Sequence, residues 1–567
     1  MKFNEYPYER PDLSAIKVDF LAKVEEIKSA SDLDQTKQAI RAIQSMQNLM
    51  ETQMTLASVR QSLDTKDDFY NQEKAFWDQH SPIIQEWVTE YKKAVLANPF
   101  KDQLGDLLPQ PFFAMAELDL KLFDAALIPL MQEENRLVSE YENLAASAVY
   151  EYKGKTLNLY GMMAEAESVD RQQRQEVNQM LFDFYQEHLA EFDSVYDKLV
   201  KVRHELATKL GFKNFIEMGY ARMYRMDYNR DDVEVYRREV LKHVVPLAQE
   251  IFQRQANRLG LDELKYYDLA LEYENGNAIP KDVPEVIVEN GVKMYHELSP
   301  ETAEFIDFMV EGSLLDLVTK PGKKTGGYCT YLPDFKAPFI FSNFNGTSAD
   351  IDVLTHEAGH AFQVYQSRWV PAPECVWPTY ESCEIHSMSM EFFAWPWMEL
   401  FFKEQTPKYK YSHLSGGVKF LPYGVLVDHF QHEVYEHPEM TPEQRRATWR
   451  KLEKQYNPWK DYDGNEFLEN GGFWFKQAHI FATPFYYIDY TLAQVCAFQF
   501  WKRAHVDQDP QAWQDYLKIC QIGGTQTFLS IVKAANLASP FEEGTLGNII
   551  DSIRQYLNNI SEADLEI

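Results

Sequence analysis

The order of apolar and polar residues follows a helical period through most of the first 300 residues. In "DLSAIKVDFLAKVEEIKSA" and "DLDQTKQAIRAIQSMQNLMETQMTLASVRQSLD", apolar residues recur every three or four positions behind an aspartate that can cap the first turn. The same pattern covers residues 112–147, where we expect a bend at Pro129, and residues 168–210. The sequence therefore predicts a mainly α-helical protein.

The pattern changes near residue 320, where glycine, proline and aromatic residues become frequent. Within "KPGKKTGGYCTYLPDFKAPFIFSNFNGTSAD", the runs "YCTYL" and "PFIFSNF" are typical of short strands. A helix is expected to begin at residues 347–350, and the chain is again mostly helical from residue 380 onward. We expect an N-terminal helical region over residues 1–200 and a catalytic region over 201–567, packed together.

Charge and composition narrow the class of protein. The chain has 56 Lys and Arg against 87 Asp and Glu, a net charge of -31, which disfavours binding to nucleic acid or to anionic membranes. No apolar run approaches the ~18–20 residues of a membrane span. The first residues lack the apolar core of a secretory signal, and the five scattered cysteines form no CxxC pair. A cytoplasmic location is expected.

Two histidines and a glutamate interrupt the apolar run "DVLTHEAGHAFQVY", residues 352–365. His356, Glu357 and His360 spell H-E-x-x-H. Positions i and i+4 share one face of a helix, so both imidazoles can reach one metal ion. The glutamate between them can take a proton from a water that the metal activates. The alternative is an ordinary half-buried helix with two structural histidines.

A catalytic metal needs a third protein ligand, and the helix expected over "TYESCEIHSMSMEFFAW" offers candidates. Glu384 and Glu391 are seven residues apart and share a face, so one could bind the metal while the other orients an imidazole. The apolar neighbours indicate a buried helix, and buried carboxylates usually have partners. His386 is an alternative ligand, but two residues from Glu384 it points to another side of the helix.

A later segment, "HIFATPFYYIDYTLAQ", combines a histidine with three tyrosines. Tyr486 and Tyr490 lie at i and i+4, and Tyr487 and Tyr490 at i and i+3. Phenols that reach a carbonyl under attack can donate a hydrogen bond to the developing oxyanion. The alternative is a stripe of core aromatic residues.

Together these motifs resemble the thimet oligopeptidase and oligoendopeptidase F family of zinc metallopeptidases, most closely its oligoendopeptidase F and Pz-peptidase branch. The resemblance rests on HEAGH (356–360), "EIHSMSME" (384–391) and "HIFATPFYYIDY" (479–490), with support from "PFIFSNFNGT" and "LGFKNFIEMGY". It covers the chain from about residue 200 to 520. The family's other branch has a glycine-rich loop where this chain has Pro484 and Phe485.

The resemblance implies one Zn²⁺ per chain, bound by His356, His360 and Glu384, with Glu357 as the general base. It implies that Glu391 bonds to one of the metal-binding imidazoles.

The resemblance also implies that His479, Tyr486 and Tyr490 act on the substrate and the tetrahedral intermediate. We expect Tyr487, Phe341 and Asn343 to line the substrate site, with the strand "PFIFSNF" pairing with the peptide backbone.

The fold implied by the resemblance is a large helical ellipsoid of two halves around a deep channel, with a small β-sheet next to the zinc-binding helix. The implied activity is hydrolysis of internal bonds in short, unstructured peptides. The Pz-peptidase branch points further to collagen-derived peptides that contain proline and glycine. The sequence predicts no oligomeric state.

Two alternatives stay open at the level of sequence. One is a zinc carboxypeptidase on a similar helical scaffold, which would need a fixed cation for the terminal carboxylate. The other is a non-catalytic peptide-binding protein with a relic metal site. The presence of Glu357 argues against this second alternative, because a relic site predicts a missing base.

Overall fold

The chain folds into two compact units, each assembled from three separate segments. The computed structural model describes residues 1–320, 322–324, 326–344 and 346–566. Unit 1 contains residues 1–121, 279–403 and 503–537, and unit 2 contains residues 122–278, 404–502 and 538–567. Residue 200 lies inside a helix of unit 2, so the expected division into sequence regions does not coincide with these units.

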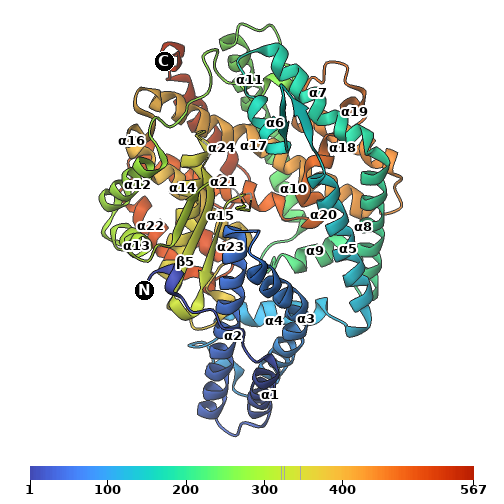
Figure 1. Ribbon diagram of the computed structural model, residues 1–567, viewed down its shortest axis with the longest axis vertical. Helices are drawn as coiled ribbons and strands as arrows, with labels where there is room; N and C mark the ends of the chain where they lie inside the picture. The colour runs from blue at the N-terminus through green and yellow to red at the C-terminus, as the bar shows by residue number, and fades with distance from the viewer. Residues whose placement is uncertain (321, 325, 345, 567) are drawn as a thin grey trace. The chain divides into compact units, whose positions relative to one another are not determined.

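Helices dominate both units, which confirms the mainly α class (Figure 1). The helices of unit 1 are α1 (Leu13–Ser29), α2 (Leu33–Leu63), α3 (Asp68–Ala97), α4 (Gln110–Leu122), α12 (Pro284–Leu298), α13 (Pro300–Glu311), α14 (Ala349–Ser367), α15 (Tyr380–Phe393), α16 (Glu399–Phe402), α22 (Gln511–Ile522) and α23 (Phe528–Ala534). Unit 2 comprises α5 (Ile128–Ala146), α6 (Leu159–Glu165), α7 (Arg171–Glu187), α8 (Leu189–Lys209), α9 (Phe215–Arg222), α10 (Arg230–Glu239), α11 (Val245–Arg258), α17 (Thr406–Glu436), α18 (Pro442–Tyr456), α19 (Glu466–Glu469), α20 (Ala478–Ala482), α21 (Tyr487–Trp501) and α24 (Thr545–Asn558).

Two stretches predicted as single helices are each divided in two. Pro129 lies in the first turn of α5 instead of bending a longer helix, because the fixed φ of proline and its missing N–H suit that turn. The second stretch divides at His188, where the backbone leaves the helical region with φ -99° and ψ 18°. Helical periodicity alone did not reveal either interruption.

Unit 1 contains a three-stranded sheet, and two of its strands, β4 (Tyr328–Leu332) and β5 (Ala337–Phe344), lie where the sequence predicts them, whereas β3 (Leu315–Val318) was not predicted. β3 runs parallel to β5, and β4 runs antiparallel to β5 on its other side. A separate two-stranded hairpin in unit 2 joins β1 (Tyr150–Tyr152) to β2 (Lys155–Leu157).

The prediction that "PFIFSNF" pairs with a substrate backbone is wrong. These residues form β5, the central strand of the sheet, which pairs with β4 over residues 337–341 on one side and with β3 over residues 340–344 on the other. Among the described strands, β4 borders β5 on one side only, so β4 is an edge strand of this sheet. Strand order depends on contacts between distant segments, which the local alternation of residues does not encode.

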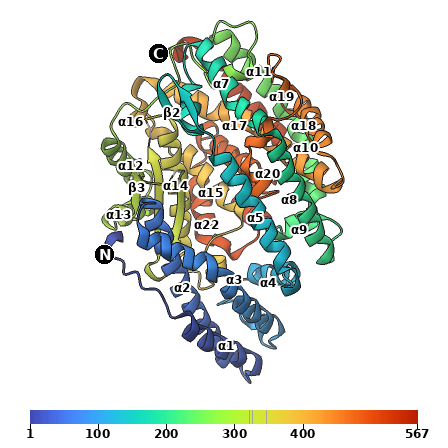
Figure 2. The same cartoon turned by 45° about the vertical axis from the view of Figure 1, so that its right-hand side comes forward.

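One hydrophobic core joins the N-terminal helices to the sheet and to α14. Phe20, Tyr91 and Phe112 belong to the same buried cluster as Tyr331 of β4 and Val364 of α14. The first 121 residues therefore support the sheet and the HEAGH helix from one side within unit 1 (Figure 2). Among the described residues, no helix is both long and apolar enough to cross a bilayer.

α14 and α15 approach each other closely at the glycine of the HEAGH motif. A Cβ atom added at Gly359 would lie 2.7 Å from the carbonyl oxygen of His386 and 2.7 Å from the Cα of Ser387. Both distances are shorter than van der Waals contact, so only glycine lets the two helices meet at this separation.

We predict that Gly359→Ala lowers the free energy of unfolding by about 1–3 kcal/mol, because the added methyl group overpacks the contact between α14 and α15. The measurement is denaturant unfolding of both proteins.

The matched control is Gly416→Ala in α17, where nothing lies within 4 Å of the added Cβ. Alanine favours the helix there by up to about 1 kcal/mol. Equal effects of the two substitutions would contradict the steric explanation.

Candidate metal centre and active site

Three side chains from α14 and α15 converge on one point in unit 1. His356 and His360 lie on the same face of α14, one helical turn apart. Their Nε2 atoms lie 3.3 Å and 3.6 Å from Oε2 of Glu384 on α15. The three donor atoms all lie within 4.8 Å of one another.

The spacing of these donors suits a small tetrahedral metal ion. Bonds of about 2.1 Å to nitrogen and oxygen ligands place the ligand atoms of a tetrahedron about 3.4 Å apart. The two measured separations, 3.3 Å and 3.6 Å, lie on either side of that value. Two imidazoles and one carboxylate also form a donor set used by catalytic metal sites, which keep the fourth position open.

Glu391 orients the first of these histidines. One oxygen of its carboxylate lies 2.7 Å from Nδ1 of His356, which leaves Nε2 directed at Glu384. Burial disfavours the charged imidazole, but hydrogen bonds to Glu384 and Glu391 raise the pKa of His356 well above its ordinary value. A carboxylate in this position fixes the ring and makes Nε2 a better metal ligand.

Glu384 is held in its ionised form. Burial alone would raise the pKa of this carboxyl, but His360 and His356 together hold it well below its usual range. The hydroxyl of Ser387 also donates to Oε2 of Glu384 at 3.0 Å. We did not predict Ser387; its position three residues after Glu384 on a helix was the available signal.

Glu357 lies beside the sheet, next to the metal-binding histidines in sequence. Its side chain is buried, with 8% of the residue exposed. Burial raises the pKa of the Glu357 carboxyl, although His356 and His360 partly offset this effect. A Cβ added at Gly327, beside β4, would lie 3.8 Å from Oε1 of Glu357, so this carboxyl lies next to the start of the edge strand β4.

His386, the alternative ligand, lies outside the donor cluster. Its ring is fully buried, and burial lowers the pKa of His386 to about 4. It lies on the side of α15 that faces α22, where its backbone carbonyl accepts a hydrogen bond from Tyr516 at 2.8 Å.

The late histidine and tyrosines form one aromatic cluster in unit 2. The ring of His479, on α20, lies 5.8 Å from that of Tyr486, 4.9 Å from that of Tyr487 and 6.0 Å from that of Tyr490. Tyr486 and Tyr490 are 5.0 Å apart, and all four residues are partly exposed. The segment is therefore not an ordinary core stripe, since each ring keeps part of its surface open.

His479 is oriented by a glutamine that we did not predict. The side-chain amide of Gln477 lies 2.9 Å from Nδ1 of His479, and the hydroxyl of Tyr423 lies 2.7 Å from Oε1 of Gln477. Burial lowers the pKa of His479, so its imidazole is neutral at neutral pH. With Nδ1 bonded to Gln477, Nε2 is the nitrogen left to interact with a ligand.

The two residues of β5 expected to line the substrate site have structural contacts of their own. Phe341 is fully buried and stacks on Tyr328 of β4, with ring centroids 4.8 Å apart. The side chain of Asn343 donates to the backbone carbonyls of Lys324 and Gly326, at 2.8 Å each. Direct contact of either residue with a substrate stays a prediction.

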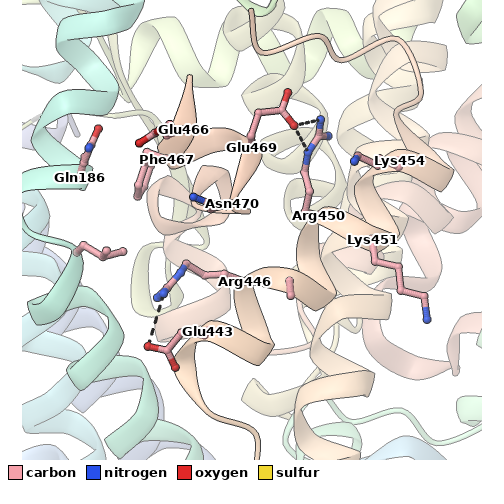
Figure 3. Close-up of a pocket in the computed structure, with 12 residues that line it drawn as sticks. Gln186, Glu443, Arg446, Arg450, Lys451, Lys454, Glu466, Phe467, Glu469 and Asn470 are labelled. Carbon is pink, nitrogen blue, oxygen red and sulfur yellow. Dashed lines mark hydrogen bonds and ion pairs between the residues drawn. The ribbon is translucent and has the colours of Figure 1, made fainter. Parts of the chain in front are cut away.

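A cavity of about 780 Å³, lined by several charged side chains, opens on unit 2 between α18 and α19 (Figure 3). Its guanidinium groups already have acidic partners. Arg450 bonds to Glu469 at 2.9 Å, and Arg446 pairs with Glu443 at 3.8 Å. None of the residues that line it belongs to the metal cluster or to the aromatic cluster.

We predict that Glu391→Gln weakens metal affinity by about 10- to 100-fold, because the neutral amide no longer makes His356 a strong ligand. A competition titration with a chromophoric chelator measures this change. Glu399→Gln, at an exposed glutamate in α16, is the matched control and should bind metal like the parent protein. Equal affinity in all three proteins would exclude the orienting role.

The sequence and the fold of this chain are similar to those of known proteins. Residues 3–123 match the Peptidase M3 N-terminal domain, and residues 164–549 match Peptidase family M3. The solved structure of Pz peptidase A with an inhibitor superimposes with a TM-score of 0.93 at 50% identity, over 99% of this chain and 100% of that one. Oligopeptidase PepF of Bacillus subtilis (strain 168) is 23% identical over 284 residues.

The match to PepF spans 45% of this chain and 41% of that relative's length. The family match, in contrast, covers more than half of this chain and includes all three metal-binding positions and the aromatic cluster. It confirms the family predicted from the HEAGH motif and the segments that follow it. The chain belongs to Peptidase family M3.

Proposed function

We propose that this protein is a zinc-dependent endopeptidase that hydrolyses internal bonds of short oligopeptides. The observation that carries the proposal is the convergence of His356, His360 and Glu384, with the buried carboxyl of Glu357 beside them and the edge strand β4 next to that carboxyl. Metal, base and a place for an extended peptide thus come together within one unit.

Zinc is the metal that we propose, at one ion per chain. The tetrahedral spacing and the two-nitrogen, one-oxygen donor set favour it over magnesium or calcium, which prefer six or more oxygen ligands. Zinc bound here would supply Lewis acidity, which makes a water molecule easier to deprotonate and a carbonyl easier to attack.

Glu357 is the proposed general base. Its raised pKa brings the carboxyl closer to neutral pH, where it can accept a proton from the attacking water and still release it. The same carboxyl then delivers that proton to the amine that leaves. Burial protects the transfer from bulk water and strengthens the electrostatic interactions on which it depends.

His479, Tyr486 and Tyr490 are the proposed substrate-binding and oxyanion-stabilising groups. Family resemblance supports this assignment, as does their shared, partly exposed cluster around a neutral imidazole. Tyr487 is the proposed substrate contact beside them. Burial raises the pKa of Tyr487, so it stays a protonated donor at neutral pH.

The proposed substrates are short, unstructured peptides, including collagen-derived peptides that contain proline and glycine. An extended peptide can add to the open edge of β4, next to Glu357, whereas a folded protein cannot present a free strand there. The resemblance to the Pz-peptidase branch supports the preference for proline and glycine. A cytoplasmic location fits the five described cysteines, all of which are free thiols.

We predict that Glu357→Gln keeps its bound zinc but loses about 10²- to 10⁴-fold in kcat, because the amide cannot accept the proton of the attacking water. Metal content and cleavage are measured with a mixed library of short peptides, blocked at the C-terminus by an amide. The parent protein should cleave internal bonds of these peptides, and a chelator should abolish cleavage.

Each alternative function has its own result when the same library is also tested without the C-terminal block. Release of single C-terminal residues from unblocked peptides only would identify a carboxypeptidase. Unchanged hydrolysis by Glu357→Gln would exclude the proposed base. Peptide binding without any hydrolysis by the zinc-loaded parent protein would identify a non-catalytic receptor.

We predict that Tyr486→Phe and Tyr490→Phe each lower kcat, by up to about 10²- to 10³-fold for a phenol that stabilises the oxyanion. Tyr487→Phe, in the same cluster, should have a smaller effect on kcat and act mainly on KM. Steady-state kinetics with one internally quenched peptide measures all three variants. A larger loss of kcat in Tyr487→Phe than in the other two would reverse the assignment.

A further inference from the structure

The link between α20 and α21 contains a phenylalanine in a strained backbone conformation. Phe485 has φ +69°, in the left-handed region, where a bulky L-residue is uncommon. Its ring is fully buried, and Pro484 before it is buried too. Such a conformation persists only when the surrounding contacts determine it more strongly than its own preference does.

Two side chains bond to the backbone of this turn, and a third bonds to one of those two. The amide of Phe485 donates to Oε1 of Gln431 at 2.9 Å, and its carbonyl accepts a short hydrogen bond from Nη2 of Arg225. The same Nη2 donates to Asp489 at 2.9 Å. We call Arg225, Gln431 and Asp489 the turn clamp. The side chains of all three residues are fully buried.

The ring of Phe485 occupies a pocket that only a glycine leaves open. A Cβ added at Gly219, on α9, would lie 2.5 Å from Cδ2 of Phe485. The ring also packs edge-on against His432, with centroids 5.0 Å apart, and lies 5.7 Å from the ring of Tyr435. Backbone and side chain of Phe485 are thus constrained at the same time.

A second buried arginine secures the other end of the link. Nη2 of Arg203 donates to the carbonyl of Phe481 at 2.5 Å, and its Nε donates to Glu134 at 2.7 Å. The side chain of Arg203 is completely buried. Residues 482–485 therefore run between two carbonyls that are each bonded to a buried guanidinium.

This link connects the two helices that carry the aromatic cluster. His479 lies on α20, six residues before Phe485. Tyr486 follows Phe485 directly and is the residue that caps the start of α21. The two rings stack 5.8 Å apart across the link. A change in the turn at Phe485 would alter the distance and angle between these rings before it disturbed either helix.

We propose that the turn clamp positions the catalytic aromatic cluster by holding Phe485 in the left-handed conformation, which sets Tyr486 and Tyr490 relative to His479. This inference rests on the proposed function, because it serves rings whose role on the substrate is itself proposed. Arg225, Gln431 and Asp489 are positioning residues, since the turn lies between them and the substrate-binding groups.

The competing explanation is that the clamp only stabilises the fold. A buried ion pair such as Arg225 with Asp489 often contributes little net stability. Here the guanidinium and the glutamine amide both bond to backbone atoms of one strained residue. That convergence indicates that the clamp controls the backbone conformation of Phe485. A change in this conformation should alter kcat, whereas a loss of stability alone should not alter the kcat of the folded protein.

The test compares Gln431→Met with the parent zinc-loaded protein. Methionine is similar to glutamine in length and volume, but its thioether is only a weak acceptor in place of the amide oxygen that Phe485 bonds to. We expect kcat to fall by up to about 100-fold with a much smaller change in KM, as for a displaced catalytic group. Arg225→Lys, whose single ammonium reaches less far, is the second variant and should act in the same direction.

Controls separate positioning from folding. Unfolding temperature and zinc content are measured for each variant, and kinetics are recorded well below the unfolding temperature. Arg445→Lys replaces another buried arginine of unit 2, bonded to Asp197 at 2.9 Å, and should leave kcat unchanged. If Arg225→Lys does not fold, Gln431→Met alone decides the question.

A double-mutant cycle with Tyr486→Phe completes the test. If the clamp acts through Tyr486, the double variant Gln431→Met/Tyr486→Phe should lose little more kcat than the more impaired single variant. Losses that multiply, or an unchanged kcat in the folded clamp variants, would overturn the proposal.

The failure of the proposed function gives a different result. In that case Tyr486→Phe and Tyr490→Phe would retain full kcat while Glu357→Gln remained inactive, and the clamp would have no catalytic group to position. Impaired tyrosine variants with fully active clamp variants would overturn the clamp alone.

Discussion

The close contact between α14 and α15 at Gly359 is the constraint on which the metal centre depends. Histidines on α14 can meet a carboxylate on α15 only if the two backbones lie nearer than most side chains allow. The absence of a Cβ at Gly359 permits this approach, and the backbone at His386 and Ser387 fills the space. The same approach brings Glu391 within 2.7 Å of His356, so one steric condition determines both ligand geometry and ligand orientation.

Charge compensation is the second condition that this site satisfies. Glu384, Glu391 and Glu357 lie together in a largely buried region, where uncompensated carboxylates are costly. His356 lies between two of these carboxylates, Glu384 and Glu391, which raise its pKa. A divalent cation supplies the positive charge more effectively than a protonated imidazole. The acidic surroundings that would destabilise an ordinary core therefore favour metal binding here.

Unit 2 holds the aromatic rings of His479 and the three tyrosines in place while leaving them partly exposed. These rings contact one another but keep part of their surface exposed, so their positions also depend on the backbone that carries them. Buried arginines bond to the carbonyls of Phe481 and Phe485, at the two ends of the link between α20 and α21. Rigidity comes from these buried bonds, and the rings themselves stay available for a ligand.

Much of this could be predicted from the sequence, because the relevant signals are local. The helical period, the strand at residues 328–332, and the i, i+4 spacing of His356 and His360 require only neighbouring residues. Glu384 and Glu391 could be recognised as candidates because two carboxylates on the same face of a helix are unusual in an apolar segment. The family followed from these motifs.

Only the tertiary structure decided which distant segments of the chain contact each other and how these contacts fix local conformation. It placed β5 in the centre of its sheet, assembled each unit from three separate segments, and set Phe485 in a conformation that its own side chain disfavours. Ser387, Gln477 and Arg225 acquired their roles through contacts that no spacing rule specifies. The physical reason is that strand order, helix approach and buried hydrogen bonds depend on the summed contacts of residues far apart in the chain, whereas a sequence pattern reports only the preferences of each residue and its neighbours.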